Sequence, residues 1–395
     1  MTASCITQAR PEVRALRSSK IREVANAALG RQDVLPFWFG EPDEPTPEVV
    51  RQAAIAALQA QQTFYVQTLG APALREALAR YLGGLHGRPV PLESVAVTSS
   101  GTTSLMLAVQ ALLNPGDRVV AVTPLWPNLV EMPKVLGAQV ETVSLAFTGS
   151  GWQLDLQRLL DALTPGTRAL LVNSPNNPTG WALPRAQQQA ILAHCRRHGI
   201  WIVSDDVYQR LYYADRCAPS FLDIADAQDR VISCNSFSKA WLMTGWRLGW
   251  IVVPPPLLPE ISKLIEYSTT CAPPFVQSAG CAALAHGEAT IAHTVERLRR
   301  GRDHLQQGLQ ALPGIRPGAP AAGAMYTFFR LEGLSDSLAF CQRLVADAGL
   351  GLAPGVAFGP EGEGYLRWCY ASSTERLDEG LRRLARFLAA RPLVP

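Results

Sequence analysis

Hydrophobic residues in the middle of the chain form short continuous runs that are separated by longer amphipathic stretches. The runs lie at 95–97, 119–122, 140–143, 169–172, 200–203 and 231–234. Apolar runs of this length, without alternation, are typical of strands that are buried on both faces of a sheet. The stretches between them, at 105–113, 128–136, 155–163 and 184–198, have the spacing of helices. We therefore expect an α/β fold whose large domain has a mostly parallel central sheet with helices on both faces.

The two ends of the chain depart from this alternation. Residues 1 to about 35 predict a helical arm, and helices follow at 47–61, with Thr46 as the N-cap, and at 72–82. After Pro273 the pattern is helical to 286, and a long charged helix is expected over about 289–312. The remainder predicts a smaller α+β domain. We expect an N-terminal arm with part of the small domain at 1–45, a large domain at 46–285 and a small C-terminal domain at 286–395.

Chemically distinctive residues follow the predicted strands at the points where they end. In chain order these are Ser100 with Gly101 and Thr102, Trp126, Asn177, Asp205 with Tyr208, and Lys239. Because ligands of open parallel sheets bind beyond the carboxyl ends of the strands, these residues are expected to share one site.

Lys239 is the residue with the most specific chemical potential. Only four of the 36 basic residues are lysines, and this one lies among apolar neighbours such as Phe237 and Trp241. A lysine removed from water near another cation, here Arg247, has a lowered pKa, and its neutral amine can form a Schiff base with a carbonyl. The alternative is an ordinary lysine that extends its charged end to solvent from a strand terminus.

The pair Asp205 and Asp206 closes another predicted strand. A carboxylate fixed there can hold a proton on a heteroaromatic nitrogen, and Tyr208 can hydrogen-bond a phenolate oxygen. The alternative for such acids is a solvated N-cap or first helical turn. We assign that structural role to Asp206 and the functional role to Asp205.

Three further segments have a functional and a structural interpretation. Residues 98–104 run from a strand through a small polar turn into a helix, an arrangement that cradles phosphate but that also serves as a simple helix cap. Trp126 is either a core residue or a stacking surface for a flat ring. The turn formers at 173–180 would hold Asn177 at the sheet edge, although any loop can carry them.

Composition narrows the possible partners. The net charge of +3, with 17% charged residues, gives no reason to expect nucleic acid or a membrane as a partner. The eight cysteines are scattered without a Cys-x-x-Cys pair, and the histidines add no metal-binding pattern. We expect no metal, no membrane span and a cytoplasmic location.

The ordered set of motifs resembles the class I/II aminotransferases, pyridoxal-phosphate-dependent enzymes of fold type I (the aspartate aminotransferase superfamily). The resemblance extends from about residue 20 to the end of the chain. It rests on Gly40 in the segment 37–43, Tyr65 before Gly70, 100–102, Trp126, 176–180, Asp205 with Tyr208, 236–239, Arg247 and 366–368.

The resemblance implies a role for each matching residue. Lys239 would bind pyridoxal 5'-phosphate as a Schiff base and then move the substrate proton, and Asp205 would keep the ring nitrogen protonated. Tyr208 and Asn177 would hydrogen-bond the phenolate oxygen of the ring, on which Trp126 would stack. Arg367 would bind the substrate carboxylate, with help from Asn177 and the backbone of Gly40. The phosphate would be held by Ser100, Gly101, Thr102, Ser236, Arg247 and, from the neighbouring subunit, Tyr65.

The resemblance further implies a homodimer with its sites at the interface, and a ping-pong transfer of the amino group between an L-amino acid and a 2-oxo acid. Some relatives that prefer dicarboxylic acids carry a lysine where Thr102 stands, so aspartate is not favoured as the donor. Four aromatic residues near the expected mouth, Phe37, Trp38, Phe39 and Trp181, would suit an apolar or uncharged side chain.

Two alternatives are open on this scaffold. A carbon–sulfur β-lyase would use the same lysine and the same electron-withdrawing ring. A transcription regulator can also carry this fold, but it needs a winged helix-turn-helix, and the roughly 35 residues before Phe37 are too few and lack its pattern.

Overall fold

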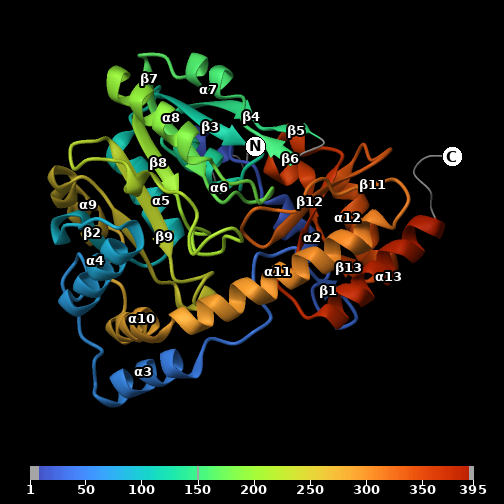
Figure 1. Cartoon of the computed structure of the whole chain (residues 1–395), viewed down its shortest axis with the longest axis horizontal. Coiled ribbons are helices and arrows are strands. Elements are labelled where there is room, and N and C mark those ends of the chain that lie inside the picture. Colours follow the sequence, from blue (N-terminus) through green and yellow to red (C-terminus); the bar gives the residue numbers. More distant parts are fainter. Residues whose placement is uncertain (1–8, 149–150, 391–395) are drawn as a thin grey trace, which may run out of the picture.

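The computed structural model describes residues 9–148 and 151–390 of the chain. Figure 1 shows a large sheet surrounded by helices and, beside it, a smaller group of strands and helices built from the C-terminal part of the chain. The long helix α11 (Glu288–Gln310) begins beside α10 (Pro274–His286) and runs to this smaller group.

The large sheet has seven strands in the order β2-β10-β9-β8-β7-β3-β4. All of them run parallel except β10, which is antiparallel to both of its neighbours. The strands are β2 (Val95–Thr98), β3 (Arg118–Thr123), β4 (Gln139–Ser144), β7 (Thr167–Asn173), β8 (Trp201–Asp205), β9 (Val231–Ser236) and β10 (Gly249–Val252).

Helices cover both faces of this sheet, because successive strand residues point to opposite sides. On β3, Val119 and Ala121 pack toward α5 (Gly101–Leu112), α6 (Asn128–Val135) and α9 (Leu258–Glu266). Val120 and Val122 pack instead toward α7 (Leu156–Ala162) and α8 (Arg185–His198). At the β2 and β10 end of the sheet, α4 (Pro72–His86) and α10 (Pro274–His286) contribute to the core, and α3 (Glu48–Gln59) packs outside α10. The expected α/β class with a mostly parallel sheet is confirmed.

The C-terminal part forms a four-stranded sheet in the order β11-β12-β15-β14. Its strands are β11 (Ile315–Arg316), β12 (Tyr326–Leu331), β14 (Ala353–Pro354) and β15 (Tyr365–Cys369). Helices α11, α12 (Ser337–Ala348) and α13 (Thr374–Ala390) pack with it. The N-terminal segment joins this part, since β1 (Leu35–Pro36) pairs with β13 (Leu350–Gly351). Two short helices, α1 (Pro11–Arg14) and α2 (Lys20–Asn26), precede β1. Strand β5 (Ala146–Thr148) pairs antiparallel with β6 (Gly151–Gln153).

Some expectations from the sequence are wrong in detail. Helix α3 begins after Pro47 as N-cap, and the hydroxyl of Thr46 instead donates a hydrogen bond to the carbonyl of Leu242. The sequence does not predict the antiparallel strand β10, because its apolar residues continue directly into Pro254 and give no separate strand signal. Within the described residues, none of the helices has the length and apolar character needed to cross a bilayer.

Candidate active site

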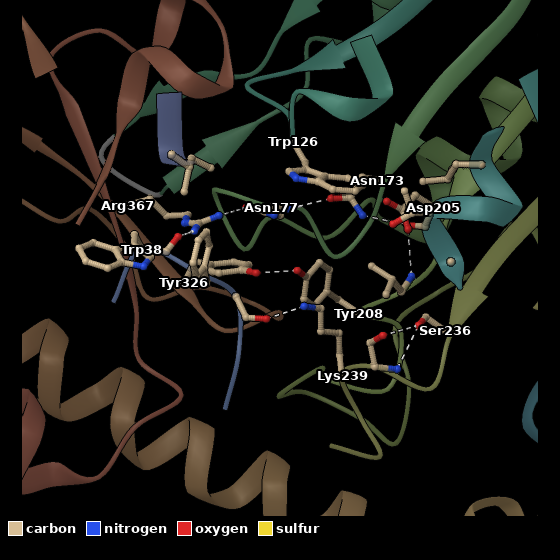
Figure 2. Close-up of a pocket in the computed structure, with 18 of the residues that line it drawn as sticks. Trp38, Trp126, Asn173, Asn177, Asp205, Tyr208, Ser236, Lys239, Tyr326 and Arg367 are labelled. Carbon is tan, nitrogen blue, oxygen red and sulfur yellow. Dashed lines mark hydrogen bonds between the residues drawn. The ribbon is translucent and has the colours of Figure 1, made fainter. Parts of the chain in front are cut away.

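A cavity of about 180 Å³ lies beyond the carboxyl ends of the parallel strands (Figure 2). It is lined by residues of β7, β8, β9 and β15, by the start of α5 and by the loop that follows β3. Eleven of the thirteen residues selected from the sequence line it: Gly40, Gly101, Thr102, Trp126, Asn177, Asp205, Tyr208, Ser236, Lys239, Arg247 and Arg367. The topology of the sheet therefore brings together groups that are up to 327 residues apart in the chain.

Lys239 extends into this cavity from the turn that follows β9 (Figure 2). Its amine donates a hydrogen bond to the carbonyl of Gly40. Removal from water, together with smaller contributions from the positive charges of Arg367 and Arg247, lowers the pKa of Lys239 to about 8. Close to neutral pH, far more of this amine is therefore neutral, and nucleophilic, than of an ordinary lysine.

Asp205 is the last residue of β8, and only 4% of it is exposed. One carboxylate oxygen accepts a hydrogen bond of 3.3 Å from the backbone N–H of Val207. Burial raises the pKa of Asp205 to about 7, with a smaller contribution from the charge of Asp206. A buried carboxyl group with a single weak donor favours a cationic N–H group placed against it, because such a partner stabilises its charged form.

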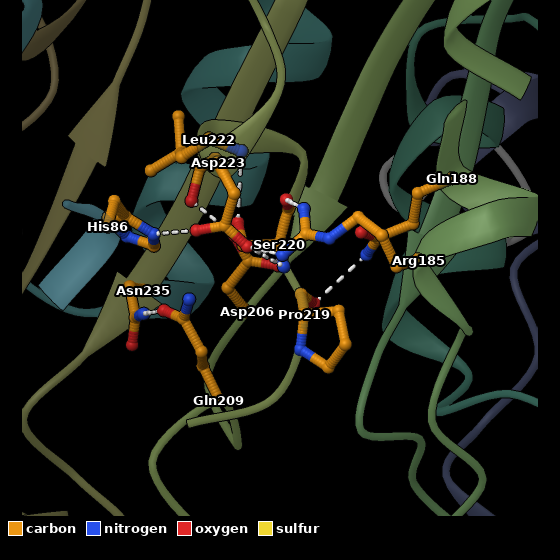
Figure 3. Close-up of polar contacts among 11 residues, drawn as sticks. His86, Arg185, Gln188, Asp206, Gln209, Pro219, Ser220, Leu222, Asp223 and Asn235 are labelled. Atoms are coloured by element: carbon orange, nitrogen blue, oxygen red, sulfur yellow. Dashed lines mark hydrogen bonds and ion pairs between the residues drawn. The ribbon is translucent and has the colours of Figure 1, made fainter. Parts of the chain in front are cut away.

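Asp206 corrects the assignment made from the sequence, because it is neither solvated nor at the start of a helix. It is 2% exposed, and its carboxylate accepts hydrogen bonds from the hydroxyls of Ser204, Ser233 and Ser220. Figure 3 shows that Ser220 connects this carboxylate to Asp223, which the ring of His86 and the guanidinium of Arg185 also contact. Asp206 therefore belongs to a polar network with Ser220 and Asp223, none of which lines the cavity.

Hydroxyl and guanidinium groups gather at one corner of the cavity, at the start of α5. Gly101 is the first residue of this helix, and a Cβ added to it would come within 3.0 Å of the Cβ of Ser236. The hydroxyl of Ser236 lies 2.9 Å from that of Ser238, and Arg247 lies nearby with its Nη1 3.5 Å from the Ser238 hydroxyl. Arg247 has φ of +55°, a costly conformation for a non-glycine residue that is characteristic of functional sites. Together, the start of α5, the two serine hydroxyls and the guanidinium of Arg247 are suited to bind a phosphate group.

Arg367 lies at the opposite end of the cavity from this corner, on β15 (Figure 2). It is 2% exposed, and its guanidinium donates to the side-chain oxygen of Asn177 at 2.9 Å and to the carbonyl of Trp38. The Nε atom is buried without a partner. A buried guanidinium whose planar donors are incompletely satisfied is suited to a carboxylate.

The donor set fits pyridoxal phosphate. A partly neutral amine matches the aldehyde, the buried carboxyl group of Asp205 matches the ring nitrogen, and the corner at Gly101 matches the phosphate. Trp126 on the cavity wall offers a flat surface for the ring.

Two of the selected residues do not line the cavity. Ser100 is 3% exposed and accepts a hydrogen bond from the backbone N–H of Thr103, so it caps α5. Tyr65 is 86% exposed on the outside of this chain.

The aromatic residues expected at the mouth divide into two pairs. Trp38 and Phe39 line the cavity. Phe37 packs on Trp368 with ring centres 5.1 Å apart, and Trp181 lies in the core beside α8, so neither of these two reaches the cavity. The expectation for this second pair is wrong because both side chains are used for packing.

Sequence reasoning missed several lining residues. Leu105 and Tyr326 lie in hydrophobic runs and Ile21 lies on the apolar side of a short charged helix, so no local signal separates them from core positions. Ser238 and Asn173 belong to motifs that the sequence does reveal, although neither stands out there as a site residue.

Comparison with known proteins gives one consistent result. The family described as aminotransferase class I and II matches residues 32–384. An aspartate aminotransferase of Thermotoga maritima is 33% identical, over 91% of this chain and 93% of its own length. An arginine–pyruvate transaminase of Pseudomonas aeruginosa is 35% identical over 92% of both chains. The solved structure of Thermus thermophilus aspartate aminotransferase with maleate has a TM-score of 0.89 at 35% identity, covering 96% of this chain and all of that one.

Proposed function

This chain belongs to the class I and II aminotransferases, and we propose that Lys239 is the residue that binds its cofactor and moves the substrate proton. The protein is a pyridoxal-phosphate-dependent enzyme that moves an amino group between an amino acid and a 2-oxo acid. When bound, pyridoxal phosphate supplies an aldehyde that receives the amino group and a ring that withdraws electrons from the substrate α-carbon. The observation that carries the assignment is a single cavity holding Lys239, Asp205 and Arg367.

Lys239 supports this proposal through its position and its pKa. A lysine with a pKa of about 8 supplies both a neutral amine for covalent attachment and, once displaced, a base matched to neutral pH. The carbonyl of Gly40, which accepts from the amine, fixes the direction in which the side chain extends.

Asp205 and Tyr208 hold the two polar atoms of the ring in the proposed complex. The carboxylate of Asp205 keeps the ring nitrogen protonated, and this cation in turn lowers the pKa of Asp205 from the value that burial alone imposes. Tyr208 and Asn177 donate hydrogen bonds to the phenolate oxygen. Gly101, Thr102, Ser236 and Arg247 hold the phosphate, while Ser100 acts on the same corner through the start of α5.

Arg367 binds the α-carboxylate of the substrate in this proposal. The guanidinium is held by Asn177 and Trp38, so little side-chain freedom is lost on binding. Three basic residues line the cavity, and each serves a different group in this proposal: Lys239 the aldehyde, Arg247 the phosphate and Arg367 the carboxylate.

We propose that the donor has an uncharged side chain. The remaining lining includes the apolar side chains of Ile21, Trp38 and Phe39, and Thr102 supplies no charge. Relatives of similar identity are named for different donors, among them aspartate and arginine, so overall identity does not select one.

A homodimer is the proposed assembly, with Tyr65 reaching the phosphate of the neighbouring subunit. Three aromatic side chains support this proposal by their exposure: Phe64 at 80%, Tyr65 at 86% and Tyr267 at 90%. Large apolar groups that are this exposed are characteristic of interfaces.

We also propose a division of the chain into domains and a cellular location. All strands of the large sheet lie within the proposed cofactor-binding domain 46–285, while β1 of the arm 1–45 pairs with β13 of the small domain 286–395. The seven described cysteines are free, which favours a reducing compartment such as the cytoplasm.

A spectral screen tests the proposed function. Each amino acid is added to cofactor-saturated protein, and the visible band of the bound aldehyde is followed as it converts to the aminated form. We expect fast conversion with aliphatic or aromatic donors, slow conversion with aspartate, and reversal by a 2-oxo acid. Release of pyruvate and ammonia from cystathionine without an acceptor would instead indicate the β-lyase, and absence of conversion with every donor would contradict the assignment.

A further inference from the structure

Tyr326 occupies a position between the residues assigned to the cofactor and to the substrate of this site (Figure 2). It is the first residue of β12, and 1% of it is exposed. Its hydroxyl lies 2.6 Å from that of Tyr208, and the two rings meet edge to face with centres 5.7 Å apart. The same hydroxyl packs against the backbone of Gly40, where an added Cβ would lie 1.7 Å from it. Two segments that are distant in the chain, at Gly40 and at Tyr208, therefore contact this one hydroxyl.

The ring of Tyr326 has a second contact. The central carbon of the Arg367 guanidinium lies 4.4 Å from its centre, and the same carbon lies 4.9 Å from the ring centre of Phe358. Both rings therefore flank a guanidinium that is almost fully removed from water, where cation–π attraction is strongest.

We propose that Tyr326 is a positioning residue with two separable parts: its hydroxyl orients the phenol of Tyr208 toward the cofactor, and its ring holds Arg367 for the substrate carboxylate. This inference rests on the proposed function, because it uses the roles given there to Tyr208 and Arg367. Nothing requires Tyr326 itself to touch a reacting atom.

The direction of the hydrogen bonds follows from the donor inventory. A phenol has one proton, so when Tyr208 donates to the phenolate oxygen of the cofactor, its own oxygen must accept from Tyr326. A donor that is itself hydrogen-bonded in this way donates more strongly. Loss of the Tyr326 hydroxyl should therefore weaken the stabilisation of the phenolate and raise the pH at which the bound cofactor changes colour.

Four ionisable groups face the tyrosine pair and contribute to this titration. Arg367 on β15 is cationic, Asp205 on β8 is acidic, Cys369 on β15 lies near Tyr326, and Lys239 after β9 carries the nitrogen that binds the cofactor in the proposed complex. Burial raises the pKa of both tyrosines, so they remain protonated over the range of the experiment. The hydroxyl substitution leaves the four groups in place, so a shift of the midpoint reports the hydrogen bond.

Two substitutions distinguish the role of the Tyr326 hydroxyl from the role of its ring. Tyr326→Phe removes only the hydroxyl and should raise the midpoint of the visible absorbance change by about one pH unit, with a fall in kcat of roughly tenfold and little change in KM. Tyr326→Leu also removes the ring and should in addition raise KM for the amino acid and for the 2-oxo acid by about tenfold.

Tyr213→Phe is the matched control. Tyr213 is partly buried and also pairs its hydroxyl with that of another tyrosine, Tyr370, at 2.9 Å, but it does not line the cavity. Both Tyr→Phe variants should lose thermal stability, measured on the cofactor-saturated protein, whereas only Tyr326→Phe should move the titration midpoint. Equal midpoints in Tyr326→Phe, Tyr213→Phe and the unchanged protein would overturn the inference and leave a purely structural tyrosine.

The result with the protein of unchanged sequence distinguishes a failure of this inference from a failure of the proposed function. If it converts its cofactor with an amino acid while Tyr326→Phe titrates as the control does, only the role of Tyr326 is wrong. If the unchanged protein converts its cofactor with no amino acid, the proposed function fails and the roles of Tyr208 and Arg367 fail with it.

Discussion

Asp205 and Asp206 are consecutive in the chain, yet their carboxyl groups lie in different environments. Asp205 lines the cavity with one backbone donor. Asp206 instead accepts from three serine hydroxyls, one of which, that of Ser220, appears in Figure 3. The two carboxylates therefore provide a natural comparison between a chemical role and a structural one.

Replacing Asp205 should slow the reaction strongly without releasing the cofactor. Asp205→Asn removes the charge that keeps the ring nitrogen protonated, so proton abstraction should slow by about a thousandfold or more. Cofactor binding should persist, because the lysine and the phosphate corner are unchanged. Single-turnover absorbance kinetics with the preferred donor measures the effect.

The neighbouring carboxylate supplies the control. Asp206→Asn should lower the free energy of unfolding by about 1–3 kcal/mol, because serine donors lose a charged acceptor, but should leave the rate within about tenfold of the unchanged protein. Equal loss of rate in the two variants would contradict the separate roles.

The pKa of Lys239 predicts the pH dependence of cofactor attachment. The neutral amine is the nucleophile, and burial lowers its pKa from the usual value to about 8. The rate at which apoprotein incorporates pyridoxal phosphate should therefore rise with pH, pass its midpoint near 8 and level off above it. Stopped-flow absorbance measures this profile, and a midpoint near that of an ordinary lysine, about 10.4, would contradict a desolvated amine.

Arg367 should control substrate affinity through the geometry of its donors. Arg367→Lys keeps the charge but loses the planar fork, so KM should rise by about a hundredfold for the amino acid and for the 2-oxo acid. Steady-state kinetics with both substrates provides the measurement. Arg330→Lys, at an exposed position of the adjacent strand β12, should leave KM unchanged; a similar rise in both variants would show that the effect is not specific to the carboxylate.

Tyr65 tests the shared site of the proposed dimer. Tyr65→Phe removes one hydroxyl from a side chain that is 86% exposed on the isolated chain, so the effect within one chain should be negligible. If that hydroxyl binds the partner's phosphate, the dissociation constant for pyridoxal phosphate should rise by about tenfold, with the dimer intact by sedimentation. Unchanged cofactor affinity, or a monomeric unchanged protein, would rule out the shared site.

Much of the fold and the centre of the site could be predicted because both follow from the parallel sheet. Uniformly apolar runs predict its strands, and the position of Asp205 and Lys239 just after two of them places both at one edge. The family resemblance added Arg367, which pattern alone leaves as an ordinary strand residue.

Other features depend on contacts that no local pattern reveals. Tyr326 begins the apolar strand β12, so it looks like any core aromatic until the fold brings it to Tyr208. The serines that donate to Asp206 come from separate segments, and no local pattern shows that they meet. The sequence alone therefore predicts that Asp206 is solvated. Phe37 is predicted at the mouth but packs on Trp368 from β15, a pairing that only the folded chain establishes.

The identity of the cofactor-binding amine is tested most directly by chemical trapping. The cofactor-saturated protein is reduced with borohydride, digested and mapped by mass spectrometry. We expect one reduced pyridoxyl label, on the peptide that contains Lys239, and none after Lys239→Ala. A label at Lys20, Lys134 or Lys263, or no label on saturated protein, would contradict the account.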